Sequence, residues 1–103
     1  YKTTGTAKPE EIKEMLDKAF KGEFMAARSK LNELLINYGL SGEDIIKQIH
    51  KTLYGLPIAD AIKVSLIDKV GEVEFRMVEG SNPNIQLESL LAYFAIAGRK
   101  MQP

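Results

Sequence analysis

Apolar residues recur at helical spacing in five successive segments of this chain, and this periodicity constrains its fold more than any other feature. Residues spaced i, i+3, i+4 and i+7 share one face of a helix and need a partner surface to cover them. No run of four to eight residues alternates as a strand would between turn residues. The pattern therefore predicts an all-α fold, a single five-helix bundle.

The first two helical patterns have clear boundaries. Pro9, followed by Glu10 and Glu11, is typical of a helix start, and Lys21-Gly22 separates this helix from the next. The expected apolar faces are Ile12, Met15, Leu16, Ala19 and Phe20 in the first helix and Phe24, Ala27, Leu31, Leu34, Leu35 and Tyr38 in the second.

Two corners between helices are also encoded locally. Gly39 and Gly80 fit the position just after a helix, where glycine adopts a left-handed conformation at little cost. Ser41 and Asn82 fit the N-cap of the helix that follows, with Pro83 at its first position. The third helix is expected to bury Ile45, Ile46, Ile49 and Leu53 and to close at Gly55-Leu56-Pro57.

The fourth pattern, about residues 59–79, has two apolar stripes, so it predicts apolar contact on two sides of one helix. A polar line between them includes Glu72, Arg76 and Glu79, spaced i, i+4 and i, i+3. This line is either a solvated helix face or a structural or interface line in which arginine holds two carboxylates. Gly71 lowers helix propensity, which predicts a close approach of another helix. The stripes are Ile62, Leu66, Val70, Val73 and Met77, and Val64, Ile67, Gly71, Phe75 and Val78.

The fifth pattern places Leu87, Leu90, Leu91 and Phe94 on one stripe and is expected to end near Gly98. Tyr93, Ile96 and Met101 lie off or beyond that stripe. They either cover core or form an apolar contact patch.

The composition fits one globular domain: the chain has 103 residues, 45% apolar and 27% charged. Fourteen basic and fourteen acidic residues give zero formal charge, so no global field attracts nucleic acid or a membrane. There is no cysteine, and no apolar run approaches the length of a membrane span. Because the chain begins at Tyr1 rather than methionine, we expect an excised piece of a longer polypeptide or a processed chain.

The residues offer little for catalysis. His50 is the single histidine and is expected to be a surface or half-buried helix residue. The phosphate-binding patterns Gly-x-x-x-x-Gly-Lys-Ser/Thr and Gly-x-Gly-x-x-Gly are absent. We therefore predict no catalytic, cofactor-binding or metal site. A DNA-binding helix-turn-helix at Gly39 is disfavoured because Glu43 and Asp44 open its would-be recognition helix.

Several segments, in order, resemble the C-terminal collar domain of the replication factor C small subunit, most like the archaeal form. They cover nearly the whole chain. The segments are Thr4-Gly5-x-Ala7-Lys8-Pro9-Glu10-Glu11-Ile12, Tyr38-Gly39-Leu40-Ser41-Gly42-Glu43-Asp44, Leu56-Pro57-Ile58 and Gly71-Glu72-x-x-Phe75-Arg76-x-x-Glu79-Gly80-x-Asn82-x-x-Ile85-Gln86-Leu87-Glu88-x-Leu90-Leu91.

This resemblance implies a helical collar or oligomerisation domain over residues 1–103, with Tyr1 to Ala7 as a linker from a preceding lid. It implies that ATP and magnesium bind in an AAA+ ATPase module that this chain lacks. The implied partners are other small subunits and one large subunit, and the whole complex engages a sliding clamp and primed DNA during replication. The implied location is the cytoplasm in an archaeon or the nucleus in a eukaryote. Two alternatives stay open: a free-standing DNA-binding or adaptor protein, and the collar of a related AAA+ protein.

Overall fold

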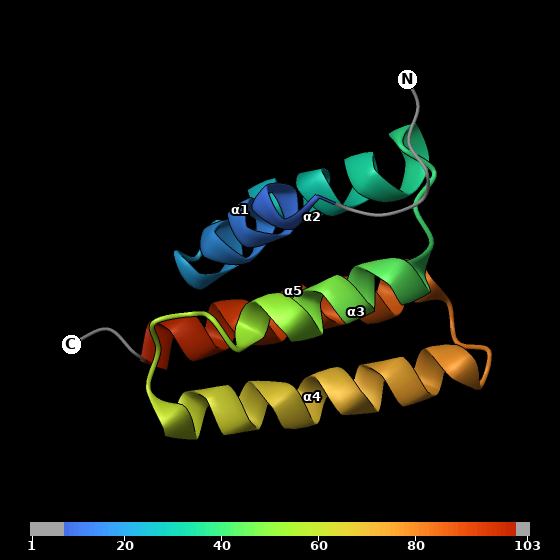
Figure 1. The fold of residues 1–103 in the computed structure, drawn as a ribbon. Helices are drawn as coiled ribbons and strands as arrows, with labels where there is room; N and C mark the ends of the chain where they lie inside the picture. Colours follow the sequence, from blue (N-terminus) through green and yellow to red (C-terminus); the bar gives the residue numbers. More distant parts are fainter. Residues whose placement is uncertain (1–7, 101–103) are drawn as a thin grey trace.

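The computed structural model describes residues 8–100, the last without its side chain, and confirms the all-α prediction (Figure 1). Helices make up every regular element of this part of the chain. None of them combines the length and the apolar character that crossing a membrane requires. The elements are α1 (Pro9–Phe20), α2 (Phe24–Asn32), the π-helical turn η1 (Glu33–Asn37), α3 (Gly42–Leu53), α4 (Asp60–Val78) and α5 (Pro83–Lys100).

The helices form three levels, with α5 in the centre of the packing. In Figure 1, α1 and α2 lie together at the top, α3 and α5 in the middle and α4 at the bottom. Helix α5 packs against all four other α-helices, whereas α4 packs mainly against α3 and α5. Among the described residues, every side chain of the buried core is apolar and no polar or charged side chain is buried. One side of α4 therefore faces away from the rest of the domain.

The predicted corners are confirmed in atomic detail. The Ser41 hydroxyl accepts a hydrogen bond from the Asp44 backbone N–H at 3.0 Å, and Asn82 Oδ1 accepts one from the Ile85 N–H at 3.1 Å. These bonds satisfy backbone donors that the first helical turn leaves open. Gly39 and Gly80 both have positive φ, at 68° and 108°, as left-handed C′ residues do.

The second predicted helix differs in its last turn. Residues 33–37 form a π-helical turn, η1, rather than continuing the α-helix. Because a π turn inserts extra backbone per turn, it shifts the phase of the residues that follow. Tyr38, which the 3.6-residue pattern assigned to the apolar face, is consequently exposed, while Leu34 is fully buried.

The predicted role of Gly98 as a helix end is wrong. Helix α5 continues through Gly98 to Lys100, and Gly98 is buried against the end of α1. A Cβ atom at Gly98 would lie 2.8 Å from the carbonyl carbon of Phe20 and 2.9 Å from its Cα. Glycine is therefore needed here because two helix backbones meet, which is a non-local requirement.

Candidate subunit interface

Helix α4 buries one of its two apolar stripes and leaves the other open. Leu66, Val70 and Val73 are buried in the core, as the first stripe predicts. We call the second set the α4 outer stripe; its members are Val64, Ile67, Gly71, Phe75 and Val78. Val64, Phe75 and Val78 are 67%, 61% and 58% exposed, while Ile67 is partly buried against the core. The prediction that α4 makes apolar contacts on two sides is therefore met, within the domain, on one side only.

Gly71 lies at the middle of this outer stripe. No atom of another helix lies within 4 Å of the position that a Cβ would take. The prediction that another helix compensates for this glycine is therefore wrong within the described part of the chain. A partner outside the domain has direct access to the α4 backbone at this point.

A groove between α3 and α4 runs beside Gly71. Its volume is about 350 Å³, with Ile46, Val70 and Gly71 among the residues that line it and His50 and Glu74 among its polar members. This apolar hollow extends the α4 outer stripe toward α3. The α4 outer stripe and the groove together form one uncovered apolar surface on α4.

His50 is exposed, consistent with its predicted surface position. Its ring meets the Tyr54 ring edge to face at 5.1 Å between centroids, and Nε2 lies 3.5 Å from the Tyr54 hydroxyl. Among the residues that the structure describes, no group of three histidine, cysteine or acidic side chains could hold a metal ion. His50 also lines the groove between α3 and α4.

Only part of the predicted polar line of α4 forms ion pairs. Arg76 Nη2 lies 2.6 Å from Glu72 Oε2, and Lys69 Nζ lies 3.3 Å from Glu72 Oε1. Glu79 makes no ion pair with any residue that the structure describes, so Arg76 is not held between two carboxylates. The Arg76 side chain is 53% exposed, and the domain itself does not shield it. Its role at a subunit contact stays a prediction.

Helix α5 also has an uncovered apolar face. We call it the α5 strip; it consists of Ile85, Ser89, Ala92 and Ile96, and both isoleucines are more than half exposed. Ser89 is exposed and Ala92 partly so. Sequence reasoning identified Ile96 but not Ile85, although Ile85 also lies off the predicted core stripe.

The other two residues of the predicted apolar patch have different outcomes. The Tyr93 hydroxyl lies 2.7 Å from Ser65 Oγ, and Lys69 Nζ lies 5.4 Å from the Tyr93 ring centroid. Tyr93 therefore connects α5 to α4 at the border of the α5 strip. Met101 lies outside the described residues.

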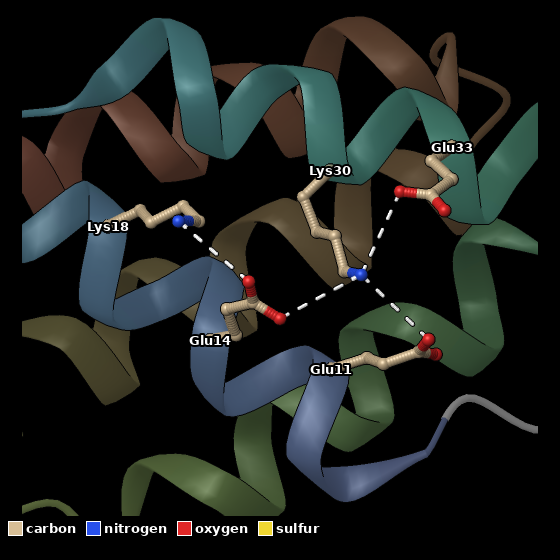
Figure 2. A network of polar contacts seen from close by, with 5 residues as sticks. All are labelled: Glu11, Glu14, Lys18, Lys30 and Glu33. Carbon is tan, nitrogen blue, oxygen red and sulfur yellow. Dashed lines mark ion pairs between the residues drawn. The ribbon is translucent and has the colours of Figure 1, made fainter.

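A five-residue ion network connects α1 to α2 and η1 (Figure 2). Lys30 lies between three carboxylates, with Nζ 3.8 Å from Glu11, 3.9 Å from Glu14 and 3.7 Å from Glu33, and Lys18 lies 3.8 Å from Glu14. These charges are partly shielded but loosely spaced, so each pair is worth a fraction of a kcal/mol to about 1 kcal/mol. The network ties the two upper helices together and leaves α4 and α5 free of it.

Comparison with known proteins identifies the family. The family model described as "Replication factor C C-terminal domain" matches residues 7–93. The chain belongs to this family. It is 57% identical over 102 residues to the replication factor C small subunit of Sulfolobus acidocaldarius, covering 97% of this chain and 31% of that protein.

Other archaeal relatives agree. Identity is 49% over 100 residues to the replication factor C small subunit of Archaeoglobus fulgidus, covering 97% of this chain and 31% of that protein. It is 51% over 100 residues to that of Pyrococcus horikoshii, covering 97% of this chain and 12% of that protein. The chain thus spans a third or less of each of these relatives. The predicted family resemblance is confirmed.

Proposed function

We propose that this chain is the collar domain through which a clamp-loader small subunit associates with neighbouring subunits. The observation that supports this most directly is the α4 outer stripe, where Val64, Phe75 and Val78 are each more than half exposed. Isolated surface hydrophobics are ordinary, but several along one helix face beside an apolar groove are typical of a protein contact. This role requires no catalytic residue.

The energy available at this face fits assembly by several modules together. Burying the exposed parts of the three large side chains would contribute about 3 to 5 kcal/mol, at ~1.5 to 3 kcal/mol for each fully buried side chain. Association costs roughly 4 to 15 kcal/mol in lost rigid-body freedom alone. These three side chains alone offset at most the lower end of that cost, so the collar contact acts together with contacts elsewhere in the full-length protein.

In this proposal the collar supports the activity of the whole assembly. The partners are other small subunits and one large subunit, and the complex uses ATP and magnesium bound in its ATPase modules to load a sliding clamp onto primed DNA. The close similarity to proteins named replication factor C small subunit supports this role. The domain's own contribution is to keep those modules in one assembly.

The test is Phe75→Glu in the full-length small subunit. The substitution places a charge at the exposed centre of the outer stripe, so assembly measured by sedimentation should weaken by at least about tenfold, and DNA-stimulated ATP turnover should fall with it. Met25→Glu is the matched control, because Met25 is an exposed apolar residue on α2. Normal assembly of the Phe75 variant would remove the basis of the proposal.

A further inference from the structure

The groove between α3 and α4 has an apolar floor with room above it. Ile46 on α3 and Ile67, Val70 and Gly71 on α4 line this floor. Gly71 contributes no side chain, and no atom of another helix lies within 4 Å of the position that its Cβ would take. An apolar cavity of about 150 Å³ already accepts benzene. The groove, at about 350 Å³, is therefore large enough for one aromatic side chain and the polar group that carries it.

The two walls of the groove carry opposite charges that do not pair with each other. Lys47 lines the groove from α3, and Glu74 lines it from α4. Neither side chain forms an ion pair or hydrogen bond with any residue that the structure describes. Opposite charges that face one groove without meeting are complementary to a molecule that carries an anionic group toward Lys47 and a cationic group toward Glu74.

The direction of the two helices places both charges at the same end of the groove. Helices α3 and α4 pack side by side and run antiparallel (Figure 1). Glu74, the last lining residue of α4, therefore lies toward Lys47, whereas Ile67 lies toward His50. The His50 ring packs edge to face on Tyr54 at 5.1 Å between centroids. From Ile67 to Glu74 the groove extends over about 10 Å, from an aromatic end to a charged end.

From this arrangement we propose that the groove binds a free α-amino acid with an aromatic side chain. Its carboxylate pairs with Lys47, its ammonium group pairs with Glu74, and its ring lies along the apolar floor toward His50. One carbon carries both charged groups of an α-amino acid, so a single head group reaches both walls at one end. A ligand with one charge leaves Lys47 or Glu74 without a partner, and a residue inside a peptide carries neither charge. This binding site goes beyond subunit association and does not depend on it.

The test is a titration of the isotope-labelled 103-residue chain with L-phenylalanine, followed by the NMR shifts of its backbone amides. The Gly71 amide should shift and saturate, with a Kd on the order of 1 mM for so small a molecule in an open groove. Phenylacetate lacks the ammonium group, phenethylamine lacks the carboxylate, and N-acetylphenylalanine amide lacks both charges. Each of these three should bind at least about tenfold more weakly than L-phenylalanine.

Two variants each remove one charge from the groove. Glu74→Gln should weaken L-phenylalanine binding at least about tenfold and leave phenylacetate binding unchanged, because phenylacetate has no group that pairs with Glu74. Lys47→Gln should likewise weaken L-phenylalanine and leave phenethylamine unchanged. Glu79→Gln on α4 and Lys51→Gln on α3 are the matched controls, since both remove an exposed charge outside the groove lining and should bind L-phenylalanine as wild type does. Thermal melts of the four variants establish that each is folded.

Four other outcomes would overturn the inference. They are no saturable shift with L-phenylalanine up to ~20 mM, equal binding of all four aromatic compounds, normal L-phenylalanine binding by Glu74→Gln or Lys47→Gln, and tighter binding of N-acetylphenylalanine amide, which would indicate a peptide segment. A shift of the Gly71 amide on dilution of the chain alone would assign the groove to a second copy and contradict the inference as well. The proposed function has its own test in Phe75→Glu, so the two ideas fail separately.

Discussion

Substituting Gly98 with alanine tests the helix crossing that the sequence pattern missed. The added Cβ would lie 2.8 and 2.9 Å from the carbonyl carbon and Cα of Phe20, and closer still to its carbonyl oxygen. These are backbone atoms, so no side-chain rotation relieves the overlap. Because the carbonyl oxygen is the nearest of these atoms, α1 and α5 must separate by roughly 1 Å or more before the contact becomes an ordinary one. The adjacent Phe20–Phe94 ring pair, with centroids 5.1 Å apart, would be displaced with them.

The expected change in the free energy of unfolding is the difference between an overpacking cost and a gain in helix propensity. Overpacking a core contact costs about 1 to 3 kcal/mol, and a backbone-on-backbone overlap belongs in the upper part of that range. Replacing a mid-helix glycine with alanine returns about 0.5 to 1 kcal/mol of helix propensity. We therefore expect Gly98→Ala to lower the free energy of unfolding by about 1 to 2 kcal/mol. For a domain of this size that lowers Tm by about 4 to 16 °C.

Gly71→Ala is the matched control, because Gly71 also lies inside a helix but has no neighbouring atom within 4 Å of an added Cβ. It should gain the helix-propensity term alone and raise the free energy of unfolding by about 0.5 to 1 kcal/mol. Urea melts of the isolated domain followed by circular dichroism measure both variants under identical conditions. If Gly98→Ala proved as stable as wild type, the close crossing of α1 and α5 would be wrong.

Three further outcomes are expected of the isolated domain. Arg76→Ala should lower the free energy of unfolding by less than about 1 kcal/mol, because its pair with Glu72 is half exposed; a larger loss in a urea melt would mean that the domain shields it. Calorimetry with magnesium and ATP should give no micromolar binding, since no phosphate-binding sequence is present, and such binding would contradict the collar assignment. Binding to duplex DNA should be weak and should fall steeply with salt, given zero net charge; a complex retained at physiological salt would favour the adaptor alternative.

The sequence predicted the local features of this fold well. The N-caps at Ser41 and Asn82 and the left-handed glycines at Gly39 and Gly80 depend on contacts within a few residues along the chain. Helical periodicity likewise identified the core faces of α1 and α3, because a residue's direction from a regular helix follows from its position. These features are determined by the local sequence and do not depend on which other segment packs beside them.

The tertiary structure decided which apolar faces are covered and which are not. Periodicity gave α4 two equivalent stripes, and only the packing of α3 and α5 showed that one is buried and the outer stripe is open. The sequence predicted a helix end near Gly98 and a close helix approach at Gly71, yet Gly98 meets the backbone of Phe20 and Gly71 has no neighbouring atom within 4 Å of an added Cβ. The ion pairs of Lys30 with Glu11 and Glu14 were likewise invisible, because these two carboxylates come from another helix, α1. The covering of the α4 stripes, the surroundings of the two glycines and the pairing of Lys30 with α1 all depend on residues distant in the sequence. A local sequence pattern carries no information about which distant segment packs against a given face.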